Sequence, residues 1–382
     1  MNFILNYADN HKRKFDCHIK KDKINRIILG SGGSNNIIID FQDNGIRLIN
    51  KVIPQLIQFN VKIERNADQL EIKFYQFFTK KYMLTNRTPH IVGIYNHQTC
   101  TRIDKLLRML VSECPSLEDR LTKKQSESDD YKICDLLLDY EAGLVRSEYD
   151  IVLLEYCPTT LSQVLSNIVH QENGPSILKR ILFQLIFTLA IIKDDYPGFE
   201  HGDFFVRNIL ISFEELYDEN DYIAYHYQKE IFYFPANGMY AKMNDFGKSV
   251  IVNKIESSTY RLYQPSYERD HRNAFNQKTD IFNLLHSIYD GHNLGTQSIA
   301  TLLNQRKKSI PIIKLMAKFL DTKTIDKINK NNRYLLDITW HIDRIKILED
   351  TVKTPDEYMM GNYFTEYQNL PKGGNVVRHF NQ

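Results

Sequence analysis

The stretch that decides the fold is His201-Gly202-Asp203-Phe204-Phe205-Val206-Arg207-Asn208, which the apolar run Ile209-Leu210-Ile211 follows. A second short string, Asp245-Phe246-Gly247, comes further along the chain. At this chain's residue frequencies, H-x-D-x-x-x-x-N and D-F-G would each arise by chance in roughly one such chain in twenty. Both in this order would arise in on the order of one chain in a thousand. The pair is therefore a much stronger signal than either string alone.

The residue types in these two strings suit phosphoryl transfer. A carboxylate near an attacking hydroxyl, here Asp203, would orient that hydroxyl and accept its proton while charge gathers on the γ-phosphoryl group. Magnesium needs hard oxygen ligands and keeps several waters, so Asn208 and Asp245 suffice as its side-chain ligands. Gly247 lets the backbone turn sharply after Asp245.

A glycine-rich turn lies upstream, between two runs with strand-like patterns: Leu29, Gly30, Ser31, Gly32, Gly33, Ser34, Asn35, Asn36 and Ile37. Glycines there let backbone N–H groups approach phosphates closely. Lys51, in the next β-branched run, can reach the α- and β-phosphates, and Glu71 on the helix predicted over residues 66–84 can hold that lysine. Lys62 is the rival lysine, but it leaves too few residues before Glu71 for a loop and two helical turns.

This set of residues resembles the eukaryotic-type protein kinase superfamily over roughly residues 24–367. The resemblance implies an α+β fold that is bilobal and protein-kinase-like, with a small β-rich N-lobe and a larger, mostly helical C-lobe. It implies that ATP and Mg²⁺ are bound, the metal by Asn208 and Asp245. The catalytic residues that it implies are Asp203, Lys51, Glu71, His201 and Arg207.

The resemblance also assigns the remaining nucleotide contacts. Besides Lys51 and the glycine-rich turn, it implies contacts from the strand that leads into the hinge, at Leu154, Glu155 and Cys157. Asp280 matches the buried aspartate that anchors the catalytic loop from a core helix. A narrower similarity, to protein kinases of large DNA viruses of eukaryotes, rests on the Phe-Phe of the catalytic loop, the aromatic stretch 232–235 and the Ile/Asn/Lys-rich usage.

The predicted organisation has four parts. A polar basic segment covers 1–23, the N-lobe 24–156 with an insertion at about 100–149, the C-lobe 157–368 and a C-terminal tail 369–382. The aromatic-rich segment 217–240 is interpreted as a packed loop rather than a docking surface.

Several positions depart from the family pattern. The third glycine of the turn is Asn35, which tolerates left-handed backbone angles. Gly202 stands where an arginine is usual, so we expect no strict need for activation-loop phosphorylation. Phe205 replaces a lysine, which weakens a Ser/Thr assignment; Arg207 either substitutes for that lysine or forms a structural salt bridge. The A-P-E motif is absent, and residues 265–268 resemble it only weakly.

Three functions remain open on the sequence. The leading one is an ATP- and magnesium-dependent protein kinase that phosphorylates a protein substrate on Ser or Thr. A small-molecule kinase of the aminoglycoside or choline type shares the His-Gly-Asp string, although Phe246, Gly247 and Asp280 favour the protein kinase. A pseudokinase that acts as a binding scaffold is the third. A scaffold would not need the predicted catalytic and metal-binding residues, so their retention argues against it.

Composition excludes several other classes. The 382 residues carry a net charge of +2, which gives no general basic field for nucleic acid. The longest apolar run, residues 181–192, is too short for a membrane span and suits a buried helix. Five cysteines, an odd number without C-x-x-C spacing, predict reduced thiols rather than a disulfide framework. We therefore expect a soluble intracellular protein, in host cytoplasm or virion if viral, with no nucleic-acid or membrane partner.

Overall fold

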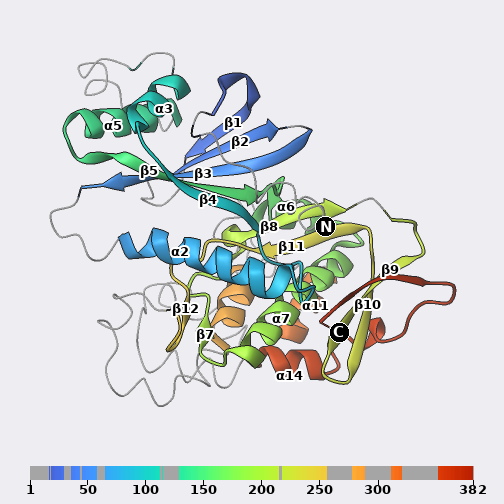
Figure 1. Ribbon diagram of the computed structural model, residues 1–382. Coiled ribbons are helices and arrows are strands. Elements are labelled where there is room, and N and C mark those ends of the chain that lie inside the picture. Colours follow the sequence, from blue (N-terminus) through green and yellow to red (C-terminus); the bar gives the residue numbers. More distant parts are fainter. Residues whose placement is uncertain are drawn as a thin grey trace. The chain divides into compact units, whose positions relative to one another are not determined.

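The computed structural model describes residues 17, 19–29, 36–43, 45–57, 65–111, 114, 129–214, 217–255, 278–288, 311–320 and 352–381. Helices and sheets are mixed along the chain (Figure 1), so the predicted α+β class is confirmed. The chain divides into two compact units, Met1–Gln76 with Gly93–Tyr156, and Phe77–Val92 with Cys157–Gln382. Residues 77–92, expected in the N-terminal part, thus belong to the second unit.

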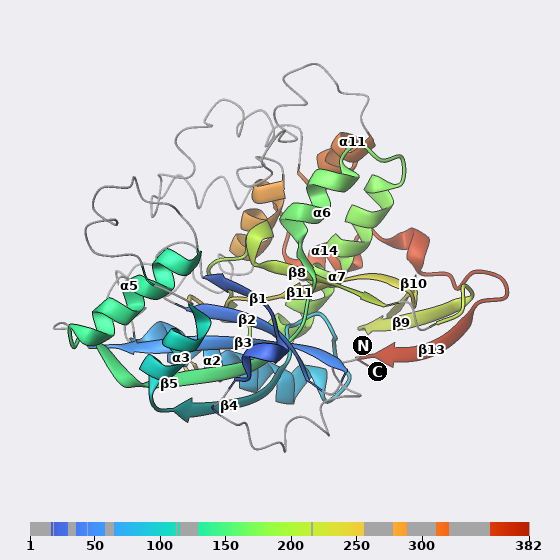
Figure 2. The ribbon, with the colours of Figure 1, turned by 90° about the horizontal axis from the view of Figure 1, so that it is seen from above.

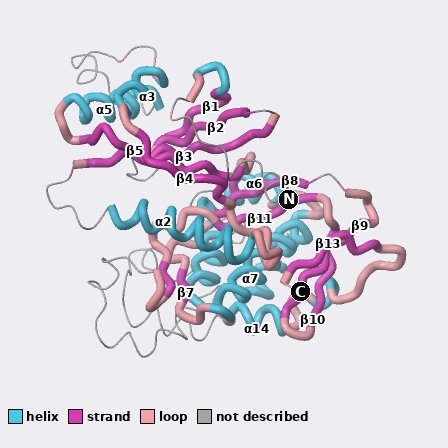
Figure 3. Tube along the Cα trace, viewed as in Figure 1, coloured by secondary structure: helices cyan, strands magenta, loops and turns pink. Residues whose placement is uncertain are grey.

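The first unit is built on a five-stranded antiparallel sheet of order β1-β2-β3-β5-β4 (Figure 3, magenta). Its strands are β1 (Ile24–Leu29), β2 (Ile37–Asp43), β3 (Ile46–Leu56), β4 (Ile94–Cys100) and β5 (Val145–Glu155). A hairpin turn joins β2 to β3, and Gly45 has a φ of +80° in that turn. A short 3₁₀ turn, η1 (Lys21–Lys23), precedes β1.

The two faces of this sheet carry different side chains, because successive residues of a strand point to opposite sides. One face packs against α3 (Ile103–Leu110) and α5 (Asp129–Glu141), which lie side by side in Figures 1 and 2. Val52 and Ile151 belong to the apolar cluster under these helices. The opposite face presents Lys51, which contacts α2 (Arg65–Phe78).

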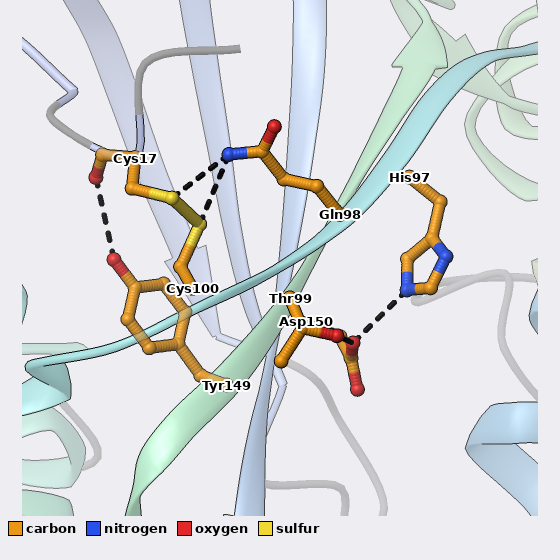
Figure 4. Close-up of a disulfide and its surroundings, with 7 residues drawn as sticks. All are labelled: Cys17, His97, Gln98, Thr99, Cys100, Tyr149 and Asp150. Carbon is orange, nitrogen blue, oxygen red and sulfur yellow. Dashed lines mark hydrogen bonds and ion pairs between the residues drawn. A yellow bond between two sulfur atoms is a disulfide. The ribbon is translucent and has the colours of Figure 1, made fainter. Parts of the chain in front are cut away.

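Two disulfides correct the expectation of reduced thiols. Cys17 pairs with Cys100 across 83 residues, and Cys114 pairs with Cys134 across 20 residues (Figure 4 shows the first). The odd count misled because two pairs plus Cys157 also make five, and long-range pairing leaves no spacing signature. The expected intracellular location therefore loses the support that reduced thiols would have given it.

The Cys17–Cys100 disulfide attaches the segment before β1 to the end of β4. Gln98 Nε2 lies 2.8 Å from Cys17 Sγ, and the Tyr149 hydroxyl donates to the Cys17 carbonyl at 3.3 Å (Figure 4). This link closes a large loop around β1, β2 and β3, so it limits the freedom of the unfolded chain.

We predict that the double substitution Cys17→Ala/Cys100→Ala lowers the free energy of unfolding by about 2–5 kcal/mol. Thermal unfolding followed with and without reductant measures the effect. Cys157→Ala, outside both disulfides, is the control and should unfold like the native protein. Equal unfolding temperatures for the double variant and the native protein in oxidising buffer would contradict the prediction.

The second unit is organised around α7 (Gly174–Asp195), whose residues from Leu178 to Lys193 are mostly buried. Its other helices include η2 (Thr79–Met83), α6 (Leu161–Ile168), α11 (Pro311–Phe319), α14 (Pro355–Met360), η3 (Val206–Asn208) and η4 (Thr365–Tyr367). Residues 278–288 are also helical. By length and composition α7 could cross a membrane, but 72% of its most apolar window is buried in the protein, as in a core helix.

The described part of the second unit also contains three small sheets. They have the orders β11-β8-β6, β10-β9-β13 and β12-β7. Their strands are β6 (Thr159–Thr160), β7 (Phe199–Glu200), β8 (Ile209–Glu214), β9 (Asp221–Tyr227), β10 (Glu230–Pro235), β11 (Gly238–Met243), β12 (Val250–Ile251) and β13 (Asn375–Phe380).

Two segments of this unit contain more regular structure than expected from the sequence. The segment 217–240 is not a loop but contains β9, β10 and the start of β11; its aromatic residues pack on α7, with Phe234 4.3 Å from Phe183 between ring centroids. The predicted tail forms β13, which pairs in parallel with β9 and buries Phe380. Local turn signals do not predict these strands. The strands in 217–240 depend on alternating aromatic residues, and β13 depends on pairing with β9, a strand that is distant along the chain.

Candidate active site

The predicted catalytic loop, residues 201–208, connects β7 to β8 and ends in η3. Asp280 holds its start: the backbone N–H groups of His201 and Gly202 donate to the Asp280 carboxylate at 3.0 and 3.3 Å. The predicted anchoring contact is therefore confirmed. Lys193, at the end of α7, lies 3.7 Å from the same carboxylate. Burial lowers the pKa of Lys193, and the Asp280 charge opposes that shift.

His201, predicted as catalytic, is completely buried inside this loop. Its Nε2 contacts the Asn244 carbonyl at 3.0 Å, and its ring packs against Phe204 and Phe246, each with a centroid distance of 5.1 Å. Burial lowers the pKa of His201 although Asp280 favours the charged form, so the ring is neutral at pH 7. These contacts connect the loop 201–208 to the segment before Asp245.

Asp203 lies between two cations. Arg207 Nη2 is 2.8 Å from Asp203 Oδ1, and Lys248 Nζ is 3.3 Å from Asp203 Oδ2. The structural salt bridge considered for Arg207 is therefore formed, with a residue four positions before it in the chain. Lys248 directly follows Asp245-Phe246-Gly247 and was not predicted from the sequence. The two cations hold the Asp203 carboxylate in one orientation.

The two predicted magnesium ligands come from adjacent segments. The last residue of β11 pairs with the first residue of β8, and the Asn244 N–H donates to the Asn208 carbonyl at 3.1 Å, so Asn208 and Asp245 lie on neighbouring strand ends. Asn208 Nδ2 donates to the Asp203 carbonyl at 2.8 Å, which turns the amide oxygen away from that carbonyl.

The donor set fits magnesium. An amide oxygen and a carboxylate are hard ligands, and Mg²⁺ commonly uses one or two carboxylates with phosphates and water. Within the described part of the chain, no group of three or more His, Cys, Asp or Glu is arranged to hold a metal by itself. Asp245 has a φ of +63°, a left-handed conformation that Asp and Asn adopt more readily than most residues.

Gly202 has a structural reason to be glycine. Its φ is +78°, and a Cβ at this position would lie 2.5 Å from the carbonyl oxygen of Lys248. No side chain fits there without displacing the backbone that carries Lys248. The backbone path therefore excludes an arginine at this position on steric grounds, in addition to any effect of the arginine's charge.

We predict that Gly202→Ala destabilises the protein by about 1–3 kcal/mol and lowers turnover, since both the backbone angle and the close approach are violated. Gly373→Ala is the matched control. Gly373 has a φ of +82°, but a Cβ there would meet no atom within 4 Å, so that variant should lose only the cost of the backbone angle. Chemical denaturation of the two variants measures the difference. Equal losses would show that the Lys248 contact is unimportant.

In the first unit, Lys51 on β3 pairs with Glu71 on α2. Lys51 Nζ lies 2.5 Å from Glu71 Oε2, and the side chains are 13% and 4% exposed. The sequence placed these two residues together from chain spacing alone, and the structure brings them together. Lys62, the rival lysine, lies outside the described residues. A buried ion pair of this kind holds a lysine ammonium at a fixed point on the sheet.

The other predicted nucleotide contacts are only partly described. Gly30 to Asn35 lie outside the described residues, while Ile37 is completely buried at the start of β2. Leu154 is buried in β5. The Glu155 N–H donates to the Gly93 carbonyl at 2.9 Å, so this donor is used within the unit. Cys157 is half-buried and outside both disulfides.

Comparison with known proteins identifies the class. No model of a known protein family matches the chain. The chain is 47% identical over 396 aligned positions to a curated protein of Acanthamoeba polyphaga mimivirus named "Putative serine/threonine-protein kinase", covering 100% of this chain and 99% of the relative. A second mimivirus protein, whose name also begins "Putative serine/threonine-protein kinase", is 23% identical over 324 positions, covering 80% of this chain and 62% of the relative.

The chain therefore belongs to the protein kinase superfamily. Within that superfamily it belongs to the same family as the first mimivirus relative, a protein of a large DNA virus. The similarity to kinases of large DNA viruses, predicted from the sequence, is confirmed.

Two residues near the site, Lys248 and Lys193, were not predicted from the sequence. Lys248 had a signal, because it adjoins a recognised string, but spacing alone does not show that its ammonium reaches Asp203. Lys193 had no such signal in the sequence. A lysine near the end of an apolar helix is expected to be exposed rather than buried against Asp280.

Proposed function

We propose that the chain is an active protein kinase that transfers the γ-phosphate of Mg-ATP to a serine or threonine hydroxyl of a protein. The two units would be the small and large lobes of a protein-kinase-like fold. The observation that carries the proposal is the arrangement around Asp203: a buried, anchored loop presents one carboxylate between two cations, beside an amide and a carboxylate suited to magnesium.

Each of these residues has its own role in the proposed phosphate transfer. Asp203 orients the acceptor hydroxyl and takes its proton as the new oxygen–phosphorus bond forms and the bond to the ADP oxygen breaks. Lys51, held by Glu71, binds phosphate oxygens of the nucleotide. Asn208 and Asp245 would hold magnesium, which neutralises phosphate charge when bound.

Two alternatives make different predictions. A small-molecule kinase would phosphorylate an aminoglycoside or choline instead of a protein. A scaffold would need none of the charged residues, whereas here Lys51–Glu71 and Asp203–Arg207 are formed ion pairs. The scaffold therefore explains less of the structure than a kinase does, and the identity of the acceptor separates the two kinds of kinase.

The test begins with thermal unfolding at increasing Mg-ATP, because a ligand that binds the folded state raises the unfolding temperature. We expect stabilisation by Mg-ATP and a smaller effect without magnesium. No stabilisation would leave the scaffold as the better explanation. The same preparation is then offered a protein panel, an aminoglycoside and choline; phosphate appearing only on a small molecule would overturn the protein-kinase proposal.

Lys248→Ala provides a further prediction for this site. The Lys248 side chain is 67% exposed, so its loss should leave stability unchanged while kcat falls about tenfold, because one of the cations beside the reacting phosphate is gone. Lys229→Ala, at an exposed lysine in the turn between β9 and β10, is the control. Unchanged kcat in Lys248→Ala would remove Lys248 from the mechanism.

A further inference from the structure

A polar cluster centred on Asp150 lies in the first unit, apart from the residues assigned above (Figure 4 shows part of it). Asp150, in the middle of β5, is only 3% exposed. Its Oδ1 accepts hydrogen bonds from His97 Nε2 at 3.0 Å and Thr99 Oγ1 at 2.7 Å, both on β4. Its Oδ2 accepts from Gln55 Nε2 on β3 and from Gln69 Nε2 on α2, each at 3.3 Å. One buried carboxylate thus connects two neighbouring strands and a helix.

The cluster lies on the same face of the sheet as the phosphate-binding lysine. In the pairing of β3 with β5, Lys51 stands opposite Val152, two residues from Asp150. Because side chains alternate along a strand, Asp150 and Lys51 project from one face. Helix α2 is therefore attached to that face at two polar points, Gln69 to Asp150 and Glu71 to Lys51.

The Asp150 carboxylate is charged in this position. Burial alone would raise the pKa of Asp150, but the hydrogen bonds from His97 and Thr99 outweigh burial and lower that pKa below its usual value. Removing one of these hydrogen-bond donors would leave the buried Asp150 carboxylate poorly solvated. The carboxylate therefore holds in place the side chains that supply the donors.

We propose that Asp150 is a positioning residue for nucleotide binding, which acts through Gln69 to fix α2 so that Glu71 stays against Lys51. This inference rests on the proposed function, because that function gives Lys51 its role. A single ion pair would leave the helix able to pivot about the contact. A second contact, two residues earlier on the same helix, removes that freedom and preorganises the ammonium.

Gln69→Ala separates positioning from stability. Gln69 is exposed, three other donors to Asp150 remain and alanine is the best helix former, so the unfolding temperature should fall only slightly. We expect kcat/KM for ATP to fall about tenfold, as for loss of a hydrogen bond to a charged group that orders a catalytic pair. Gln76→Ala, a second exposed glutamine of α2, is the matched control and should behave as the native protein. Equal kcat/KM in both variants and the native protein would overturn the inference.

Amide hydrogen exchange of α2, measured without nucleotide, tests the same point independently of activity. Asp150→Asn should speed exchange in residues 65–76. Asp40→Asn should not, although Asp40 is equally buried at 3% exposed, because its partners Asn25 and Arg47 lie on β1 and β3. In Asp150→Asn, the additional change Gln69→Ala should have a smaller effect than in the native protein, because removing the charge has already weakened the contact.

The outcomes are distinguishable. If the native protein neither binds Mg-ATP nor transfers phosphate, the proposed function fails, and the exchange measurement still decides whether Asp150 orders α2. If the native protein is active and α2 exchanges equally in Asp150→Asn and Asp40→Asn, the positioning role of Asp150 is wrong.

Discussion

Asp203→Asn should abolish phosphate transfer while leaving nucleotide binding intact. The substitution keeps the size of the side chain but removes the group that accepts the hydroxyl proton, and general-base catalysis of this kind contributes typically 10²–10⁴-fold. We therefore expect kcat to fall by about that factor, with the Mg-ATP-dependent rise in unfolding temperature retained.

Two observations make this prediction specific to Asp203. Its carboxylate is oriented by Arg207 and Lys248 rather than by the backbone network that holds the loop. That network runs through Asp280, so the loop should keep its path in the variant. Turnover equal to that of the native protein would remove Asp203 from the mechanism, and loss of nucleotide stabilisation would show a structural role instead.

Lys51→Met has the second-largest expected effect. Loss of a preorganised cation at the phosphates should lower kcat by about 10²–10³-fold. It should also destabilise the protein, because Glu71 is buried and would lose its Lys51 partner, a change that costs about 3–5 kcal/mol for a buried pair. Initial rates and chemical denaturation measure the two effects separately.

The double variant Lys51→Met/Glu71→Gln separates catalysis from folding. Without a buried carboxylate, stability should recover most of the loss, whereas activity should remain as low as in Lys51→Met. Lys62→Ala is the control for the sequence alignment and should retain near-native activity. If Lys62→Ala is the damaging change, the assignment of the phosphate-binding lysine is wrong.

The sequence predicted contacts that depend on short spacing or on recognised strings. The Lys51–Glu71 pair follows from one strand, one connection and one helix, so residue counting could place it. The contact of Asp280 with the catalytic loop follows from the family pattern. The strands of the first unit follow from β-branched runs cut by turn residues.

What the sequence could not predict depends on partners distant along the chain. The Cys17–Cys100 disulfide, the β9–β13 pairing and the Asp150–Gln69 contact join segments 83, 154 and 81 residues apart. None of these has a local signature, because each arises only when the sheet or helix that carries the second residue has formed. The Asp203–Lys248 contact was missed for the same reason, since the strand pairing of β8 with β11 creates it.

The most direct test of the central claim is transfer of labelled γ-phosphate from Mg-ATP to a panel of proteins, followed by phosphoamino-acid analysis. Asp245→Asn is the control, because asparagine tolerates the left-handed backbone angle of Asp245 while weakening the proposed metal site. The account predicts phosphoserine or phosphothreonine with the native protein and a strong loss with the control. Label on tyrosine would contradict the Ser/Thr assignment, and no label on any protein, with Mg-ATP bound, would contradict protein phosphorylation itself.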